Sequence, residues 1–319
     1  MNMLTTKLHR PPLTAEHVFR YRLIDELNKN IYKPLSLICA PAGYGKSMLA
    51  SSWIEEADFQ SVWLSLSEDD NDLFTFLNYF VIAIQKIFPG KLSKTQAILN
   101  AQELGKEILI SHTLINELDQ IQEPFIVVLD DYHLIHSNDI HQQVDELLRY
   151  PPENLHLCIL TRRDPPLKIA SLRSHNRMTE IRMDDLGFLE DEVLSLFNKL
   201  HGIELERSTA ISLMDKTEGW ITALRMISLA SKNNPDIEKK LLAFKGSLYS
   251  LTEFLIEEIR SGLSDEMEDL LFATALLKNF CLDLVKACYT KSENVTLEGP
   301  SIDELFHQLI NSDLFIVAL

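Results

Sequence analysis

The feature that most constrains this chain is an eight-residue stretch, Ala-Pro-Ala-Gly-Tyr-Gly-Lys-Ser, at residues 40–47. An apolar, strand-like run at residues 35–40 precedes it, and a helical pattern over residues 48–56 follows it. A glycine-rich turn between a strand and a helix that ends in Lys-Ser is the context of a phosphate-binding loop (P-loop). We therefore expect backbone amides to surround the β-phosphate of ATP or ADP, with Lys46 at the β/γ oxygens and Ser47 at Mg²⁺.

The loop departs from the usual P-loop pattern at its first position, where Ala40 replaces glycine. Alanine fits there if the backbone keeps a negative φ, because only a positive φ favours glycine strongly. The candidate nucleotide-binding residues of the loop are Pro41, Ala42, Gly43, Tyr44, Gly45, Lys46, Ser47 and Met48.

Short apolar runs rich in β-forming residues alternate with helical stretches through the first 185 residues. The runs cover residues 35–40, 61–66, 125–130, 155–160 and 178–183. This alternation favours an α/β fold with a parallel, doubly wound sheet covered by helices on both faces. Residues 72–88 carry an apolar stripe so broad that we expect their helix to be buried on most sides, with Asp72 available as its cap.

Strand signals stop after Leu186, and helical patterns follow at residues 190–201, 207–218 and 220–231. We expect an all-α domain here, and then a third domain with helices at residues 250–262, 264–278 and 301–311. The predicted divisions are 1–34, 35–185, 186–248 and 249–319. Residues 314–319 resemble an apolar edge strand without a partner, so we expect an N-terminal part of a longer protein.

Acidic and basic side chains are also expected at the edge of the sheet where the P-loop lies. Asp130 and Asp131 end the apolar run 125–130, as required of a strand that brings a carboxylate to the phosphates. Asp130 would hold Mg²⁺ through water and Asp131 would orient or deprotonate the attacking water, unless the segment is only a core strand with an acidic turn. Arg162, or alternatively Arg163, follows the next strand and would contact the γ-phosphate.

Composition narrows the classes of partner. The net charge of −17 disfavours direct DNA binding by this region, and no apolar run reaches the roughly 20 residues of a membrane span. Apolar surroundings of the four cysteines predict reduced cytosolic thiols, with Cys281 and Cys288 in a core. The basic surplus within residues 1–33 serves either a nucleotide phosphate or solvated surface. His133, His136 and His141 are read as solvated loop histidines rather than a zinc site.

Several stretches together resemble the ATPase region of the MalT-like large transcriptional activators of the LuxR type. This bacterial group lies within the signal-transducing NTPases of the STAND class. The similar stretches are 7–11 (KLHRP), 18–23 (VFRYRL), the P-loop, 62–66 (VWLSL), 128–133 (VLDDYH), and 218–220 (EGW) with 223–224 (AL). The similarity runs along essentially the whole chain.

This resemblance implies a P-loop domain, a helical domain and a truncated winged-helix domain at residues 249–319, with ADP between them at rest. It implies that ATP and an inducer open the module for self-association, and that a helix-turn-helix elsewhere in a parent protein binds DNA. Residues 1–34 would form an adenine-side segment through Val18, Phe19 and Arg20. Gly219 and Trp220 would begin a helix that closes over the nucleotide.

Three functional hypotheses follow. The leading one is a slow, regulatory, cytoplasmic ATPase whose ATP and ADP forms differ in shape, with Lys46, Asp131 and Arg162 as its catalytic set. A small-molecule kinase could use the same fold. An inert scaffold held together by ADP is the third. Phosphoryl transfer to an acceptor distinguishes the second hypothesis, and unchanged shape without turnover distinguishes the third.

Overall fold

The computed structural model describes residues 4–57, 59–101, 107–202, 204–231, 264–274, 277, 281–289 and 300–311. It divides the chain into two compact units, Met1–Ser228 and Leu229–Leu319. The first unit contains every described strand.

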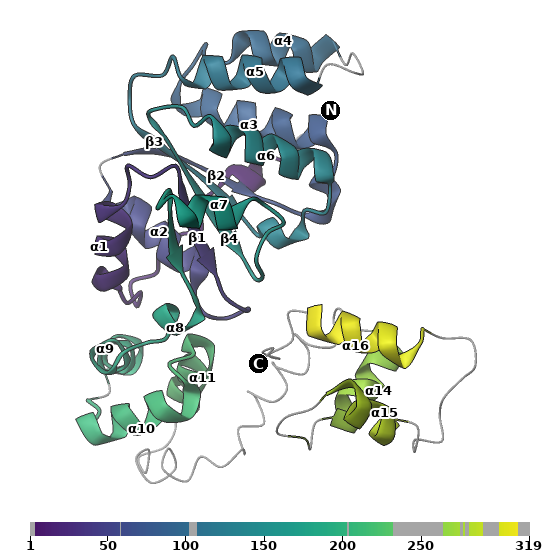
Figure 1. Cartoon of the computed structure of the whole chain (residues 1–319). Helices are drawn as coiled ribbons and strands as arrows, with labels where there is room; N and C mark the ends of the chain where they lie inside the picture. Colours follow the sequence, from purple (N-terminus) through teal and green to yellow (C-terminus); the bar gives the residue numbers. More distant parts are fainter. Residues whose placement is uncertain are drawn as a thin grey trace. The chain divides into compact units, whose positions relative to one another are not determined.

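A sheet of five parallel strands forms the centre of the first unit (Figure 1). The strands are β1 Leu35–Cys39, β2 Gln60–Ser65, β3 Phe125–Asp130, β4 Leu155–Thr161 and β5 Met178–Ile181. Every residue of β1, β3 and β4 is buried, which explains their predominantly apolar sequences. The predicted parallel sheet is confirmed, and the predicted strand ends lie within two residues of those observed.

The strand order β2-β3-β4-β1-β5 decides which loops meet. β4 lies between β1 and β3, so the loops that follow these three strands emerge side by side at one edge of the sheet. That edge receives the P-loop after β1, the carboxylates after β3 and the arginines after β4. It is the position at which open parallel sheets bind ligands.

Helices cover both faces of the sheet because successive side chains of a buried strand point to opposite sides. Leu35 and Leu37 of β1 pack in a core with one group of helices, and Ile38 packs in a second core with another group. The first group is α3 Leu73–Ile87, α4 Ser93–Ala101, α5 Glu107–Leu118, α6 Asn138–Arg149 and α7 Ile169–Ser174; the second is α1 Tyr21–Lys29 and α2 Lys46–Glu56.

The apolar helix predicted over residues 72–88 is confirmed as α3. Eight of its side chains are buried, from Leu73 to Ile84. Asp72 caps it by accepting a hydrogen bond from the Thr75 amide at 2.8 Å. Helix α2 begins at Lys46, two residues before the predicted start, because the glycine turn leads directly into it.

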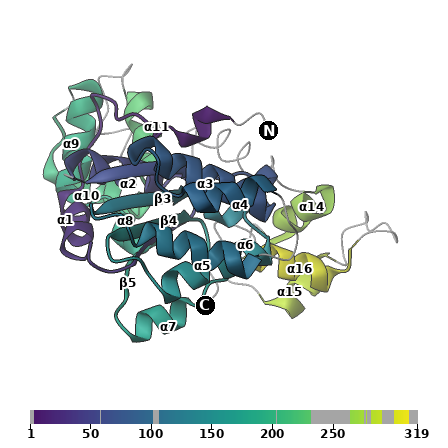
Figure 2. The ribbon, with the colours of Figure 1, turned by 90° about the horizontal axis from the view of Figure 1, so that it is seen from above.

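A helical region follows the sheet within the first unit, as predicted. It consists of α8 Met183–Leu186, α9 Glu190–His201, α10 Arg207–Thr217 and α11 Ile221–Ser231. Helices α9, α10 and α11 lie together in both views (Figures 1 and 2). Arg22 connects this helical region to α1 within the first unit. Its guanidinium donates to the Glu192 carboxylate at 2.9 Å and to the Gly187 carbonyl at 2.7 Å.

The second unit contains α14 Asp265–Thr274, α15 Leu282–Tyr289 and α16 Ile302–Asn311. Their shared core includes Leu270, Val285 and Leu309. The described residues of this unit form helices alone, so a winged-helix domain is not shown. The helix expected at 250–262 and the strand expected at 314–319 lie outside the described residues. Cys281 is exposed just before α15, so its predicted core position is wrong.

Within the described ranges, no helix is both long and apolar enough to cross a membrane.

Candidate nucleotide-binding site

The predicted phosphate-binding loop connects β1 to α2. Gly43 and Gly45 have φ values of +79° and +75°, a conformation that glycine adopts readily. The described non-glycine residues with positive φ do not include Ala40, so the alanine is accommodated as expected. Its amide continues the sheet by donating to the Thr161 carbonyl at 3.2 Å.

Four consecutive carbonyls of this loop accept hydrogen bonds from side chains outside it. Trp220 Nε1 donates to Ala42 at 3.3 Å, and Thr222 Oγ1 donates to Gly43 at 2.9 Å. The guanidinium of Arg20 donates to Tyr44 at 3.3 Å and to Gly45 at 2.7 Å. The loop is therefore held from two sides, by the N-terminal segment and by the start of α11.

Lys46 is buried in the loop that it ends. Its Nζ donates to the carbonyls of Ala40 at 2.6 Å and Pro41 at 3.0 Å. Burial, followed by the charge of Arg162, lowers the pKa of Lys46 to about 8. The ammonium is thus held within the loop by two of the loop's own carbonyls.

Ser47 and Asp130 face each other where α2 begins and β3 ends. Ser47 Oγ donates to Asp130 Oδ1 at 3.1 Å. Burial, reinforced by the neighbouring charge of Asp131, raises the pKa of Asp130 to about 6. A hydroxyl and a buried carboxylate at this spacing supply the hard oxygen donors that Mg²⁺ prefers.

Asp131 and Arg162 flank this pair. Asp131 adopts a left-handed conformation with φ 56°, and its amide donates to Asp130 Oδ1 at 3.0 Å. Arg162 is half-buried after β4, close enough for its charge to lower the pKa of Lys46. Lys46, Ser47, Asp130, Asp131 and Arg162 therefore gather at one edge of the sheet. Asp164 forms an ion pair with Arg182, a partner that the sequence did not suggest.

His133 is a polar residue of this edge whose position was not anticipated. Its side chain is 6% exposed, and its Nδ1 lies 3.9 Å from Asp131 Oδ1 without a hydrogen-bond partner in the described part of the chain. Burial, followed by the charges of Arg162 and Lys46, lowers the pKa of His133 to about 3, so the imidazole is neutral. His133, Thr161 and Arg163 line a cavity of about 290 Å³.

The expectation of solvated loop histidines is wrong for His133 and also for His141, which is 5% exposed. His141 lies on the buried face of α6, with its Nδ1 3.0 Å from the hydroxyl of Tyr132. The amphipathic helix α6 was not recognised in the sequence, and its register places His141 on the buried face. His136 is exposed, as expected.

Most basic side chains of the N-terminal segment bind the protein itself. Lys7 forms an ion pair with the buried Asp70 at 2.7 Å, and Arg10 forms one with Glu55. Arg20 is 2% exposed and also donates to the Leu186 carbonyl at 3.0 Å. The basic surplus of this segment is therefore used largely for intramolecular bonds, a use that charge counting alone does not reveal.

Val18 and Phe19 lie beside the helical region. Val18 is buried, and the ring of Phe19 stacks on Tyr21 with centroids 5.6 Å apart. Lys199 of α9 donates to the His17 carbonyl at 2.8 Å and lies 6.0 Å from the centroid of the Phe19 ring. This contact brings the segment against α9.

The turn before α11 depends on Gly219. Its φ is +68°, and a Cβ on it would lie 2.5 Å from the amide nitrogen of Phe188. That amide donates to the Gly219 carbonyl at 2.9 Å. The close approach places Trp220 and Thr222 against the P-loop. Thr222 was not among the predicted site residues, and it lies between the similar stretches 218–220 and 223–224.

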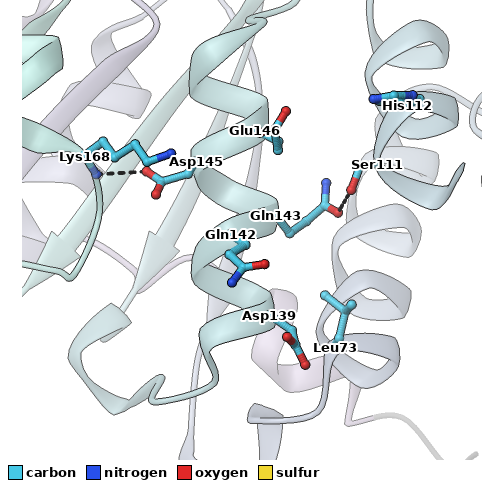
Figure 3. Close-up of a pocket in the computed structure, with 9 residues that line it drawn as sticks. All are labelled: Leu73, Ser111, His112, Asp139, Gln142, Gln143, Asp145, Glu146 and Lys168. Carbon is cyan, nitrogen blue, oxygen red and sulfur yellow. Dashed lines mark hydrogen bonds between the residues drawn. The ribbon is translucent and has the colours of Figure 1, made fainter. Parts of the chain in front are cut away.

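A separate polar cavity of about 600 Å³ lies between α5 and α6 (Figure 3). Gln143 of α6 accepts a hydrogen bond from Ser111 of α5 there, and Asp139, Asp145 and Glu146 add carboxylates. The lining contains none of the candidate nucleotide-binding residues.

The fold and the site together define the class: a parallel-sheet unit of the P-loop NTPase type, followed by a helical region. No family model matches the chain. The HTH-type transcriptional regulator MalT of Yersinia enterocolitica is 34% identical over 280 residues, which are 87% of this chain and 31% of that protein. MalT of Yersinia pestis has the same identity and coverage. The resemblance to MalT-like regulators is confirmed, and the chain spans about a third of the length of these relatives.

A solved structure resembles the fold across most of the chain. It is a Signal Transduction ATPase with Numerous Domains (STAND) protein with a tetratricopeptide repeat sensor from Pyrococcus horikoshii. The TM-score is 0.50 at 19% identity, covering 90% of this chain and 39% of that one. At this identity the likeness concerns the fold alone.

Proposed function

We propose that this chain is the nucleotide-binding switch module of a MalT-like transcriptional activator. In this proposal ADP holds a resting form, ATP permits an oligomerising active form, and slow hydrolysis returns the module to rest. The observation that carries the proposal is the direct bonding of α11 to the P-loop through Trp220 and Thr222. Because loop and helix share hydrogen bonds, a change at the phosphates can alter the position of the helical region.

The residues present fit a nucleotide with Mg²⁺. The amides from Ala42 to Met48, the buried ammonium of Lys46 and the facing pair Ser47 and Asp130 suit phosphates and a divalent cation. Mg²⁺, when bound, would neutralise charge on the β- and γ-phosphates. Val18, Phe19 and Arg20 would lie on the adenine side, and Gly219 with Trp220 would close over the nucleotide.

For hydrolysis, we assign Asp131 to orient or deprotonate the attacking water. Its carboxylate is 46% exposed and therefore accessible to water. Arg162 would stabilise charge on the γ-phosphate, consistent with its electrostatic proximity to Lys46. Because the carboxylate of Asp131 is half-exposed rather than enclosed in a water-excluded site, a slow reaction is favoured.

The remaining parts of the proposal concern a longer parent protein in the cytoplasm. Its MalT relatives are named as helix-turn-helix regulators. DNA binding through such a domain and recognition of a small-molecule or protein inducer are proposed for the parent. The net charge of −17 disfavours DNA binding by this chain itself.

Binding of Mg²⁺–ADP and Mg²⁺–ATP to the purified chain, measured by calorimetry, tests the proposal. Lys46→Ala should abolish binding because the ammonium is lost, whereas Lys29→Ala on the exposed face of α1 should bind as wild type. Asp131→Asn should bind ATP but not release phosphate. Wild-type ADP affinity in Lys46→Ala would contradict the site. Equal light-scattering mass in ADP and ATP would contradict the switch.

A further inference from the structure

We propose that Thr222 is a positioning residue for the nucleotide phosphates, acting with Trp220 through the carbonyls of the P-loop. By holding these carbonyls outward, the two side chains turn the neighbouring amides toward the phosphates. The affinity for ADP thereby depends on the position of α11. This inference rests on the proposed function and names the contact by which the helical region would control the site.

A hydrogen bond to a carbonyl of the P-loop also fixes the direction of the following amide, because the peptide bond is planar. A carbonyl and the next amide N–H share a plane and point in opposite directions. Trp220 and Thr222 fix the carbonyls of Ala42 and Gly43, and so they fix the direction of the amides of Gly43 and Tyr44. Arg20 does the same, through the carbonyls of Tyr44 and Gly45, for the amides of Gly45 and Lys46.

An array of successive amides that point into one concavity is an anion-binding device. Half of the array in this loop is therefore aligned by α11 and half by the N-terminal segment. The peptide plane after Gly45 is also held by the first turn of α2, through the Leu49 amide at 2.9 Å, whereas Gly43 is a glycine whose peptide planes rotate more freely.

The side chains of Thr222 and Trp220 lie close to the backbone of Gly43. A Cβ placed on Gly43 would lie 2.4 Å from Thr222 Oγ1 and 2.7 Å from Trp220 Nε1. The Thr222 and Trp220 side chains therefore occupy the space into which a side chain at position 43 would extend. A displacement of α11 that stretches the 2.9 Å bond of Thr222 beyond about 3.5 Å breaks it.

Thr222 is also anchored to the helical region. Glu218 and Gly219 both have positive φ, and the carbonyl of Gly219 accepts the amide of Phe188 at 2.9 Å. The start of α11 therefore moves together with residues 187 and 188. Motion of that region carries the Thr222 hydroxyl away from Gly43 and releases the peptide plane.

The experiment compares Thr222→Val with Thr222→Ser in the full chain, with Mg²⁺–ADP as the probe in calorimetry. Valine keeps the shape but removes the donor, so the Kd should rise about fivefold, the effect of one neutral hydrogen bond. Serine keeps the hydroxyl and should bind within about twofold of wild type. Without nucleotide the thermal midpoint should fall by about 2–4 °C for valine, the cost of one hydrogen bond, and should change little for serine. The ADP-induced rise should shrink for valine alone.

Trp220→Phe is the second variant, because it removes the Nε1 donor but keeps an aromatic ring. It should weaken Mg²⁺–ADP binding to a similar degree even if the valine variant does not fold. Wild-type affinity in Thr222→Val, or equal weakening by valine and serine, overturns the inference. If Lys46→Ala abolishes binding in the same series, the proposed function stands without it. If Lys46→Ala binds normally, the proposed function itself fails.

Discussion

Arg20 connects three parts of the first unit, and its replacement tests how strongly they depend on one side chain. Its guanidinium donates to the carbonyls of Tyr44, Gly45 and Leu186 at 3.3, 2.7 and 3.0 Å. It is 2% exposed, and burial lowers its pKa to about 10, so it stays charged at neutral pH. Arg20→Met keeps an apolar stem of similar length and removes all three donors.

The magnitude follows from the acceptors left behind. Gly45 keeps a second donor, the amide of Leu49 at 2.9 Å. Tyr44 and Leu186 each lose a charged donor, which costs about 1–3 kcal/mol per buried carbonyl. The relief of a buried charge offsets part of this sum, so a net loss of about 3 kcal/mol is expected. For a unit of this size that corresponds to a fall in Tm of about 6–12 °C.

Urea unfolding of the nucleotide-free chain at pH 7.5, followed by circular dichroism, measures the loss. Lys29→Met is the matched control, because it removes a positive charge from the exposed face of α1 and should cost less than about 0.5 kcal/mol. Arg20→Lys should lie between the two, since an ammonium reaches fewer of the carbonyls. A loss in Arg20→Met no larger than that of the control would refute the role given to this guanidinium.

Three further predictions concern buried charges. Lys7→Met should lower the free energy of unfolding by about 3–4 kcal/mol, because it leaves the carboxylate of Asp70, which is 1% exposed, without its cation. Adding Asp70→Asn should recover part of this loss in urea titrations, and strictly additive effects of the two substitutions would contradict the ion pair. Burial raises the pKa of Asp130 from 3.8 to about 6, so the folded state holds the extra proton and the free energy of unfolding falls as pH rises through that window. Asp130→Asn should remove this loss of about 3 kcal/mol and be more stable than wild type at pH 7 but not at pH 3.5, as measured by urea unfolding without nucleotide. Burial lowers the pKa of His156 from 6.5 to about 4, so the free energy of unfolding falls as pH falls through that range. In urea titrations at several pH values, His156→Gln should reduce this dependence by about 1 kcal/mol per pH unit, and an unchanged dependence would assign the acid sensitivity to another residue.

Local patterns predicted much of the fold because they depend on residues near in sequence. The run from Phe125 to Asp130 is apolar on both faces, and the structure shows it as a strand buried on both faces. The P-loop was predicted for the same reason, since its glycines, lysine and serine lie within the five residues 43–47. Among the helices that were not predicted, α5 has no clear apolar stripe, whereas α6 is amphipathic and its stripe was overlooked.

The division between sequence and tertiary structure is clearest in the loop at residues 40–47. The sequence by itself determined that a phosphate-binding turn follows a buried strand, and that Lys46, Ser47 and Asp130 accompany it. Only the tertiary structure decided what holds the loop, because hydrogen bonds between residues some 180 positions apart leave no local pattern. Thr222 carried no signal in the sequence, and Arg20 was singled out only through the resemblance, without its contact to the loop. The packing of α11 and the N-terminal segment brings their donors to four consecutive carbonyls and so links the site to the helical region.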